Sequence, residues 1–422
     1  MKQIIPIMLI ASAPLTGMAQ NKSGIVVDNL DKTTNPTEDF YKFATGGWQK
    51  NNPLPAAYSR FGSFDQLQED NNKRINAILS DLLKKNYKAG TTEYKLSEFY
   101  KLSMDSVRRN EEGVRPVMPI LNEMEAAKTL ADLRKVQLNH PVAGYGIPLG
   151  YGFGADEKNA KMNILQISQG GLTLGLKEYY LDNDAATKTI RDAYKQHIVK
   201  MFKLFGFDEA AATAKRDAIM RFETSVALIS KNRTELRDVE ANYNKTTLEA
   251  FKTDYPNIPL EEMANAEGIK SEYLKDIVVG QPTFLAGVDK LLSVLTADDL
   301  RAIMEWDAIL SAASYLSDDI QAANFEFFGK VMRGRQEDYP RWKRATNQVE
   351  SQMGEALGKM YCERYFPASS KKRMEQLVKN LQIALGERIK AQDWMSDSTK
   401  QAALDKLASF YVKIGYPNAW KD

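Results

Sequence analysis

The stretch GSFDQLQEDNNKRINAILSDLL, residues 62–83, decides the class of this fold. Its apolar residues recur at spacings of three, four, seven and eight positions, and they are Phe64, Leu67, Ile75, Ile78, Leu79, Leu82 and Leu83. An α-helix turns once in about 3.6 residues, so these side chains share one face. The stretch is therefore predicted to be an amphipathic helix whose apolar stripe faces a core.

Similar stripes recur further along the chain, and each is also predicted to be a core face. They comprise Ile219, Phe222, Val226 and Ile229; Val349, Met353, Leu357 and Met360; and Met374, Leu377, Val378, Leu381, Leu385 and Ile389. One section alternates instead, with apolar residues over 147–153, a polar turn over 156–159 and a second extended run over 162–167. That pattern predicts a β-hairpin with a loop somewhat longer than the tightest type. The fold class expected is mainly α with a small β-hairpin.

Composition and charge place the chain among ordinary soluble globular proteins. Of its 422 residues, 27% are charged and 10% are aromatic, which is usual for packed domains. Lys plus Arg number 57 and Asp plus Glu number 55, so the formal net charge is +2. A nucleic-acid-binding protein needs a clustered basic surplus to neutralise phosphates. We therefore expect no nucleic-acid partner.

The first 19 residues have the pattern of a secretory signal peptide. Lys2 supplies the basic start, residues 4–13 form a short apolar run, and Gly17-Met18-Ala19 offers small residues before a cleavage point. No later run approaches the length of about 18 apolar residues that a membrane-spanning helix needs, so no transmembrane segment is expected. The single cysteine, Cys362, excludes an internal disulfide. These features predict an exported protein, periplasmic or extracellular in a bacterium.

No catalytic constellation is visible in the residues themselves. A catalytic zinc site takes three protein ligands, commonly including two histidines one helical turn apart. This chain has only His140 and His197, and neither belongs to a His-Glu-x-x-His motif. Each is expected to be a surface residue or a partner of a helix C-terminus. We therefore predict no catalytic residues, no metal site and no bound cofactor in this chain.

Several motifs, in order along the chain, resemble those of the neprilysin-like zinc endopeptidases. The first is NPTEDFYKFATGGW at residues 35–48, followed by NPLP at 52–55 and SRFGSFD at 59–65. The later ones are QGGL at 169–172, EYYL at 178–181, Arg237-Asp238, YNK at 243–245, Trp342-Lys343, Met353-Gly354, ALG at 356–358, Tyr361 and IGYP at 414–417. The resemblance thus spans nearly the whole chain after residue 34.

The resemblance implies a largely helical N-terminal cap region over a thermolysin-like catalytic domain. Full members are secreted or membrane-anchored enzymes that cut small peptides inside a closed chamber, and their zinc ligands lie in the C-terminal catalytic domain. The chain is expected to correspond to the cap without that catalytic partner, because its last motif, KIGYPNAW at 413–420, resembles the seam between the two regions. It is thus expected to be inactive alone, with zinc and the peptide substrate bound by the complete enzyme.

Arg60 and Asp65 are the substrate-binding candidates that the resemblance implies. In neprilysin-like enzymes an Arg of the Ser-Arg-aromatic-Gly block lines the primed substrate pocket, and Arg60 matches it, while Asp65 matches an acidic residue that holds that Arg. A guanidinium suits a substrate carboxylate because it binds both oxygens. A structural Arg60–Asp65 ion pair is the alternative. Gln68 departs from the pattern, since neprilysin has a second Arg there.

The organisation expected is a signal peptide over 1–19, an extended segment over 20–37 and one helical region over 38–422, with a possible internal joint near 257–280. If the seam packs on a missing domain, Tyr416 and Trp420 should leave apolar surface exposed. The alternative function is a non-catalytic exported protein that binds peptides or glycans. Its sugar-stacking candidates would be Trp48, Trp306, Trp342, Trp394 and Trp420.

Overall fold

The computed structural model of the chain describes residues 25–140 and 146–421. The predicted signal peptide, residues 1–19, and the first residues of the segment 20–37 lie outside the described residues. Within the described part, no helix is long and apolar enough to cross a membrane.

The described residues form 17 α-helices and one small sheet, which confirms the mainly α fold class. The helices are α1 (Phe40–Asn51), α2 (Ser63–Leu82), α3 (Thr92–Met104), α4 (Ser106–Glu112), α5 (Met118–Ala126), α6 (Leu130–Asn139), α7 (Glu178–Leu181), α8 (Ala185–Leu204), α9 (Glu209–Ile229), α10 (Leu248–Asp254), α11 (Leu260–Ala266), α12 (Pro282–Val294), α13 (Ala297–Ala312), α14 (Asp318–Asn324), α15 (Arg341–Tyr365), α16 (Ala368–Lys390) and α17 (Asp397–Ala408). The strands are β1 (Leu149–Asp156), β2 (Asn159–Gln169), β3 (Asn244–Thr247) and β4 (Asp276–Val279).

Polar side chains at the residue before the helix define many of the helix starts. At nine helices this side chain accepts a hydrogen bond from a backbone N–H of the first turn, which would otherwise lack a partner. These capping residues are Asp39, Thr91, Asp105, Thr129, Asp184, Asp208, Thr247, Thr296 and Ser396. The helix boundaries therefore follow from local sequence as well as from packing.

The sheet has the strand order β1-β2-β4-β3. β1 and β2 form the predicted antiparallel hairpin, but its turn contains only Glu157 and Lys158 and is tighter than expected. The added strand β4 lies parallel to β2 and antiparallel to β3. Residues 257–280 contain α11 and this inner strand. The division of the chain at that segment stays a prediction.

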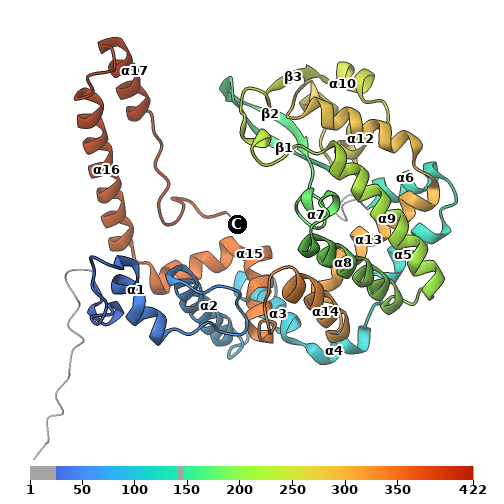
Figure 1. Ribbon diagram of the computed structural model, residues 1–422, viewed down its shortest axis with the longest axis horizontal. Helices are drawn as coiled ribbons and strands as arrows, with labels where there is room; N and C mark the ends of the chain where they lie inside the picture. The colour runs from blue at the N-terminus through green and yellow to red at the C-terminus, as the bar shows by residue number, and fades with distance from the viewer. Residues whose placement is uncertain (1–24, 141–145, 422) are drawn as a thin grey trace, which may run out of the picture.

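The molecule has three parts, which Figure 1 shows as a U. The base comprises α1–α3 and α15, the arm comprises α16, α17 and the closing segment 409–421, and the lobe comprises α4–α14 with the sheet. Two apolar cores lie in the lobe, and a third lies in the base between α2, α3 and α15. The end of the chain lies between the arm and the lobe (Figure 1).

The predicted apolar stripes do not all pack into a core. In α9 and α15 they do, as Val226 and Val349 show with exposed fractions of 1% and 0%. In α2 the half from Ile75 to Leu82 is buried, whereas Phe64, Leu67 and Leu83 are exposed. The prediction was wrong for α16, where Met374, Leu377, Leu381 and Leu385 are all exposed. Periodicity identifies an apolar face, but nothing among the described residues covers this one.

Candidate functional site

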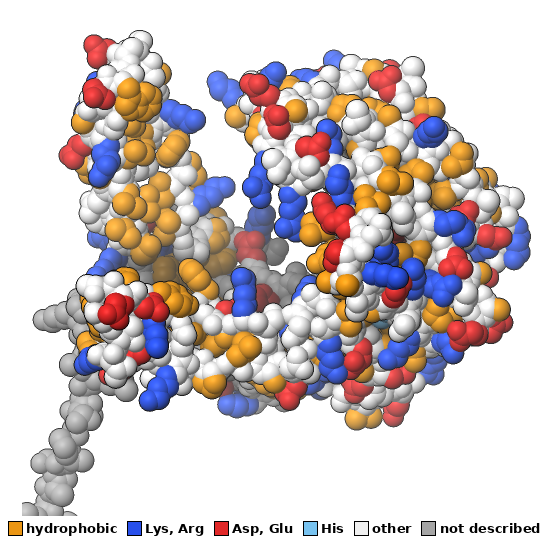
Figure 2. All heavy atoms as spheres, viewed as in Figure 1, with side chains coloured by type: hydrophobic (Ala, Val, Ile, Leu, Met, Phe, Trp, Pro, Cys, Tyr) orange, Lys and Arg blue, Asp and Glu red, His pale blue; other side chains and the backbone are white. Residues whose placement is uncertain are grey.

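A deep hollow opens between the arm and the lobe, and the base forms its floor (Figure 2). Apolar side chains gather along the arm in the same view. On the apolar stripe of α16, Leu377 is 49% exposed and Leu381 is 60% exposed. Apolar surface of this extent on one element is unusual for a soluble protein and marks an interaction face.

The closing segment partly covers its own aromatic residues. The Tyr416 and Trp420 rings stack with centroids 5.9 Å apart, and the Phe366 ring meets Tyr416 edge-on. Lys371 Nζ donates to the Tyr416 carbonyl at 2.8 Å. Both predicted residues are therefore only half-buried, and the most exposed apolar residue of the segment is Tyr411 at 79%.

Arg60 lies in the loop between α1 and α2, where it is exposed. It lines a groove of about 620 Å³ together with Trp48, Leu54 and Phe61. The Trp48 and Phe61 rings stack in this groove at a centroid distance of 6.1 Å. The groove thus combines an apolar wall with one guanidinium, which is a suitable surface for an extended peptide with a carboxylate.

Asp65 does not pair with Arg60. No ion pair joins the two among the described residues; instead Asp65 Oδ2 accepts the Gly62 N–H at 2.9 Å. Asp65 is the third residue of α2, so this bond caps the helix. The structural ion pair that we held as an alternative is therefore not formed, and the Arg60 guanidinium is left to face the groove. Its substrate contact stays a prediction.

A buried polar cluster fixes the loop that carries Arg60. Lys343 is 4% exposed, pairs with Glu69 and donates to the Tyr58 hydroxyl at 2.7 Å. Its ammonium also lies 3.9 Å from the centroid of the Tyr339 ring. Arg335 Nε donates to the carbonyl of Ala57 at 2.9 Å. The loop is thereby tied to α15, about 280 residues away in sequence, and Arg60 has a rigid support.

Gln68 faces a second, smaller groove between α2 and α15. Its amide donates to Asn72 Oδ1 at 3.0 Å, and Tyr361 across the groove donates to Asn71 Oδ1 at 2.8 Å. Glu350 also lines this groove, and Arg74 Nη1 donates to the Tyr361 hydroxyl at 3.2 Å.

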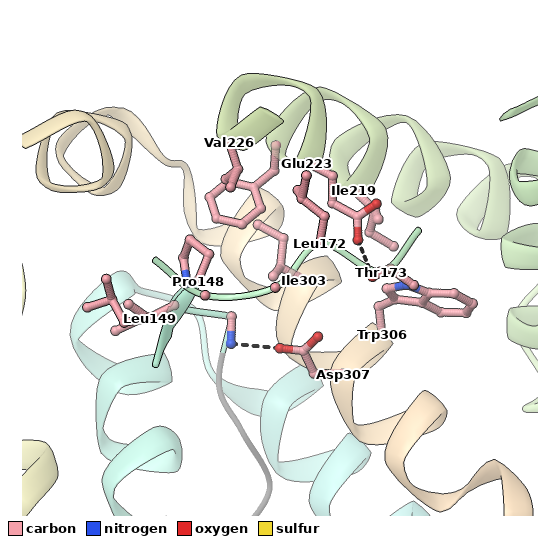
Figure 3. A pocket seen from close by; sticks show the side chains of 15 residues that line it. Pro148, Leu149, Leu172, Thr173, Ile219, Glu223, Val226, Ile303, Trp306 and Asp307 are labelled. Atoms are coloured by element: carbon pink, nitrogen blue, oxygen red, sulfur yellow. Dashed lines mark hydrogen bonds between the residues drawn. The ribbon is translucent and has the colours of Figure 1, made fainter. Parts of the chain in front are cut away.

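The lobe contains a partly open cavity of about 160 Å³ beside two carboxyl groups, Glu223 of α9 and Asp307 of α13 (Figure 3). Glu223 accepts hydrogen bonds from Thr173, from Tyr180 at 2.9 Å and from Tyr194 at 3.1 Å. Burial raises the pKa of Glu223 to about 7 and that of Asp307 to about 6. Neither residue was predicted from the sequence, because a single acid in a helical pattern looks like a surface residue.

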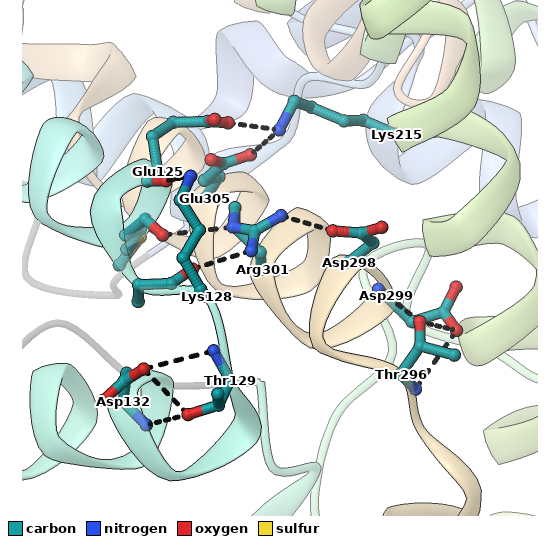
Figure 4. Close-up of polar contacts among 12 residues, drawn as sticks. Glu125, Lys128, Thr129, Asp132, Lys215, Thr296, Asp298, Asp299, Arg301 and Glu305 are labelled. Atoms are coloured by element: carbon teal, nitrogen blue, oxygen red, sulfur yellow. Dashed lines mark hydrogen bonds and ion pairs between the residues drawn. The ribbon is translucent and has the colours of Figure 1, made fainter.

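A second buried ionic cluster joins α5, α9 and α13 (Figure 4). Lys215 Nζ lies 2.7 Å from Glu125 Oε1 and 2.6 Å from Glu305 Oε2. Glu305 is fully buried, and its Oε1 has no hydrogen-bond partner. Burial, followed by the contact with Glu125, raises the pKa of Glu305 to about 8. The cluster runs from the core to the surface, since the Glu125 side chain is 45% exposed and that of Lys215 is 13% exposed.

The two histidines lie in different surroundings. His140 ends α6, as predicted, and contacts Glu123 at 2.7 Å. His197 was expected at the surface or a helix end, and that was wrong. It is 4% exposed in the middle of α8 and packs against Trp306 and Phe327. Burial lowers the pKa of His197 to about 3, so it is a neutral core residue.

The described residues contain no group of three or more His, Cys, Asp or Glu side chains that could hold a metal ion. The tryptophans are likewise dispersed: Trp306 is buried and donates to Tyr194, whereas Trp394 is 74% exposed. The residues present here therefore do not fit a catalytic zinc, and the most specific candidate site is the Arg60 groove.

The model of peptidase family M13 matches residues 36–417. The chain belongs to peptidase family M13. The predicted resemblance to the N-terminal region of neprilysin-like peptidases is thereby confirmed.

Curated M13 relatives include endothelin-converting enzyme 1. The chain is 29% identical to the rat protein over 417 residues, which are 96% of this chain and 54% of that protein. It is also 29% identical to the human protein, over 93% of this chain and 52% of that protein. The chain therefore spans about half the length of these M13 relatives.

Solved structures of M13 proteins share this fold. The zinc metalloprotease ZMP1 of Mycobacterium tuberculosis, in complex with an inhibitor, superimposes with a TM-score of 0.87 at 28% identity, over 94% of this chain and 60% of that one. PEPO from Lactobacillus rhamnosis HN001 gives a TM-score of 0.79 at 23% identity, over 92% and 61% of the two chains. The U shape is thus an M13 arrangement.

Proposed function

We propose that this chain forms the N-terminal part of the substrate chamber of an exported, zinc-dependent endopeptidase that acts on peptides. The observation that carries the proposal is the match to peptidase family M13 over residues 36–417, combined with the hollow between arm and lobe. In this arrangement the lobe and the base form the walls, and the apolar face of α16 packs on the catalytic domain. Burial of that face would remove the exposed apolar surface at Leu377 and Leu381.

The catalytic zinc is proposed to be held outside these 422 residues. The chain has no His-Glu-x-x-His motif, and its two histidines lie in separate surroundings. When bound, the metal would activate a water molecule for attack on the peptide bond. The contribution of this chain is to enclose and orient the peptide, and the chain alone is proposed to be inactive.

Arg60 is proposed to contact the peptide on its C-terminal side. The guanidinium is exposed in a groove, has no ion-pair partner among the described residues and stands on a loop fixed by Lys343 and Arg335. A carboxylate on the peptide would accept two parallel hydrogen bonds from it. Asp65 acts indirectly, because it caps α2 and sets the position of Gly62 two residues after Arg60.

Export to the periplasm or the cell exterior is also proposed. It rests on the pattern of residues 1–19, in which a basic residue precedes a short apolar run and a small-residue cleavage point. Expression of the chain from its own start codon, followed by N-terminal sequencing of the exported product, tests this point. A mature N-terminus at residue 20 is expected, and an intact N-terminus in the cytoplasm would contradict export.

Two experiments test the peptidase proposal. In the first, the purified chain is incubated with zinc and a fluorogenic peptide; no cleavage is expected, and stoichiometric zinc binding with proteolysis would overturn the claim of inactivity. In the second, the gene is read past codon 422. An in-frame sequence that encodes His-Glu-x-x-His is expected, whereas a stop codon without such a motif would contradict the enzyme proposal for this molecule.

The Arg60 assignment has its own test in the complete enzyme. Arg60→Ala is expected to raise KM for peptides with a free C-terminal carboxylate by about tenfold, the loss of one bidentate charged contact. Peptides with an amidated C-terminus should show no such change. Arg233→Ala is the matched control, since Arg233 is exposed on another loop. An equal change for both peptide classes would refute the assignment.

The alternative, a non-catalytic exported protein that binds peptides or glycans, is favoured by one observation: Trp394 is 74% exposed. Its ring stands beside the turn between α16 and α17, where a sugar ring could stack on it. Titration of the chain with glycans, monitored by tryptophan fluorescence, tests this. A response that Trp394→Ala abolishes would support the alternative.

A further inference from the structure

A cluster of arginines lies where the lobe meets the base. Arg341 and Arg344 share one face of α15 with Gln348, at positions i, i+3 and i+7. Gln348 Nε2 donates to the Ser314 carbonyl at 3.1 Å, and Arg109 Nη2 from α4 donates to the same carbonyl at 3.3 Å. The shared carbonyl brings the guanidinium of Arg109 to the α15 face that carries the other two.

The positive charge of this cluster is poorly compensated. Arg344 forms an ion pair with Asp338 at 3.1 Å, but Asp338 also forms an ion pair with Arg335, so one carboxylate serves two guanidiniums. Arg109 donates only to backbone carbonyls, and Arg341 takes part in none of the ion pairs among the described residues. Two further acids, Asp318 and Asp105, lie near Arg341 and offset part of its charge. Asp318 accepts from the amide of Asn110, and Asp105 accepts from the backbone N–H of Arg108. Burial, followed by the charges of Arg341 and Arg344, lowers the pKa of Arg109 to about 10.

Hydrogen-bond donors at this junction are also unpartnered. Seven buried side-chain polar atoms in the described part of the chain lack a partner, and three of them are Arg341 Nε, Arg341 Nη2 and Arg344 Nε. Each such donor costs free energy as long as nothing accepts from it. Arg341 as a whole residue is half-buried, whereas its unpartnered nitrogens Nε and Nη2 contact almost no solvent. A small acceptor-rich ligand would satisfy these donors and balance the charge together.

We propose that Arg109, Arg341 and Arg344 form a binding site for a tetrahedral oxyanion of the phosphate or sulfate type. The three guanidiniums come from two separate elements, α4 and α15, and their donors suit a tetrahedral group, which has acceptors on all sides. Arg341 is also the first residue of α15, which has a kink at Met353, and the dipole of the helical segment before the kink adds positive potential there. The bound anion would link α4 of the lobe to α15 of the base.

The test is thermal unfolding of the whole chain, followed by tryptophan fluorescence, as inorganic phosphate is added at constant ionic strength. A saturable rise in Tm is expected for the wild type. Arg341→Gln should weaken the apparent affinity for phosphate by about tenfold or more, the loss of one charge-assisted contact. Arg233→Gln removes the same charge from an exposed loop and should respond as the wild type does.

Arg341→Lys is the control for misfolding, because it keeps the positive charge and removes only the forked hydrogen-bond donors of the guanidinium. It should retain a weaker response to phosphate. Three results would overturn the proposal: an equal response of Arg341→Gln and the wild type, a Tm rise that follows ionic strength with chloride alone, or an equal rise with acetate, which would indicate a carboxylate site. The peptidase proposal does not depend on any of these outcomes.

Discussion

The buried carboxyl of Glu305 makes a quantitative prediction about how stability depends on pH. Its pKa is raised from an ordinary value of 4.5 to about 8 in the folded chain, chiefly by burial. The folded state therefore holds a proton that the unfolded state has released, and the free energy of unfolding must fall as pH rises between these values. Glu305→Gln, which mimics the protonated form, should remove this part of the pH dependence.

The size of the effect follows from the two pKa values. Each pH unit across which the folded chain holds one extra proton removes about 1.4 kcal/mol, so the wild type should lose about 3 kcal/mol relative to Glu305→Gln between about pH 5 and about pH 8. A chain of this length has an unfolding entropy of about 0.9 kcal/mol/K, so the loss corresponds to about 3 °C in Tm. Glu305 is fully buried, so solvent screening does not reduce the estimate.

Urea unfolding followed by tryptophan fluorescence provides the assay, because Trp306 is buried next to Glu305 in α13. The measured quantity is the difference in unfolding free energy between the wild type and Glu305→Gln at each pH. Glu326→Gln is the control, since Glu326 forms only an exposed pair with Lys330. Parallel pH profiles for the wild type and Glu305→Gln would show that Glu305 titrates normally and refute the reasoning.

Three further predictions concern packing. Lys343→Met should destabilise the chain by about 3 kcal/mol in urea unfolding, because it leaves Glu69 without its cation. The double variant Lys343→Met/Glu69→Leu should recover part of that loss, and a double variant whose loss equals the sum of the two single losses would contradict the pairing. Gly47→Ala should lower the free energy of unfolding by about 1 to 3 kcal/mol, since the new Cβ would lie 2.3 Å from the Asp28 carbonyl oxygen. Gly354→Ala is the control, because its new Cβ meets no atom within 4 Å and should not destabilise the chain; equal effects of the two variants on Tm would refute the clash. Leu381→Gln on the exposed α16 face should change the unfolding free energy by less than about 0.5 kcal/mol and should reduce hydrophobic-dye binding. A loss of unfolding free energy as large as that for a core leucine would mean that the face is covered.

The fold class could be predicted because the helical signal is local. Stripes such as Ile219–Ile229 and the alternation around Tyr151 reflect periods of about 3.6 and 2 residues, and both formed the expected elements. The capping residues are local signals too, as Thr129 and Asp132 show in their reciprocal bonds at the start of α6. The tight turn at Glu157-Lys158 was missed because the bulge next to Asp156 shortens the loop.

The buried charges could not be predicted, because their partners are distant in sequence. Glu69 pairs with Lys343 from another helix, and Glu305 meets Lys215 in the same way. A sequence window around any of these residues resembles a solvated helix face. His197 was misplaced for the same reason, since its burial depends on Trp306 and Phe327 from other elements.

The exposed face of α16 connects the fold to the proposed function. An amphipathic helix of 23 residues that leaves Leu377, Leu381 and Leu385 in water gains nothing from its apolar stripe unless another surface covers it. α16 packs on α17 but shares few contacts with the base and the lobe, so a surface that packs on α16 would also fix the width of the hollow. Arg60, by contrast, lies on the loop before α2, which Arg335 and Lys343 hold through their bonds to Ala57 and Tyr58. The groove that we propose to bind the peptide is therefore formed by this chain, whereas the apolar face of α16 needs a second surface to cover it.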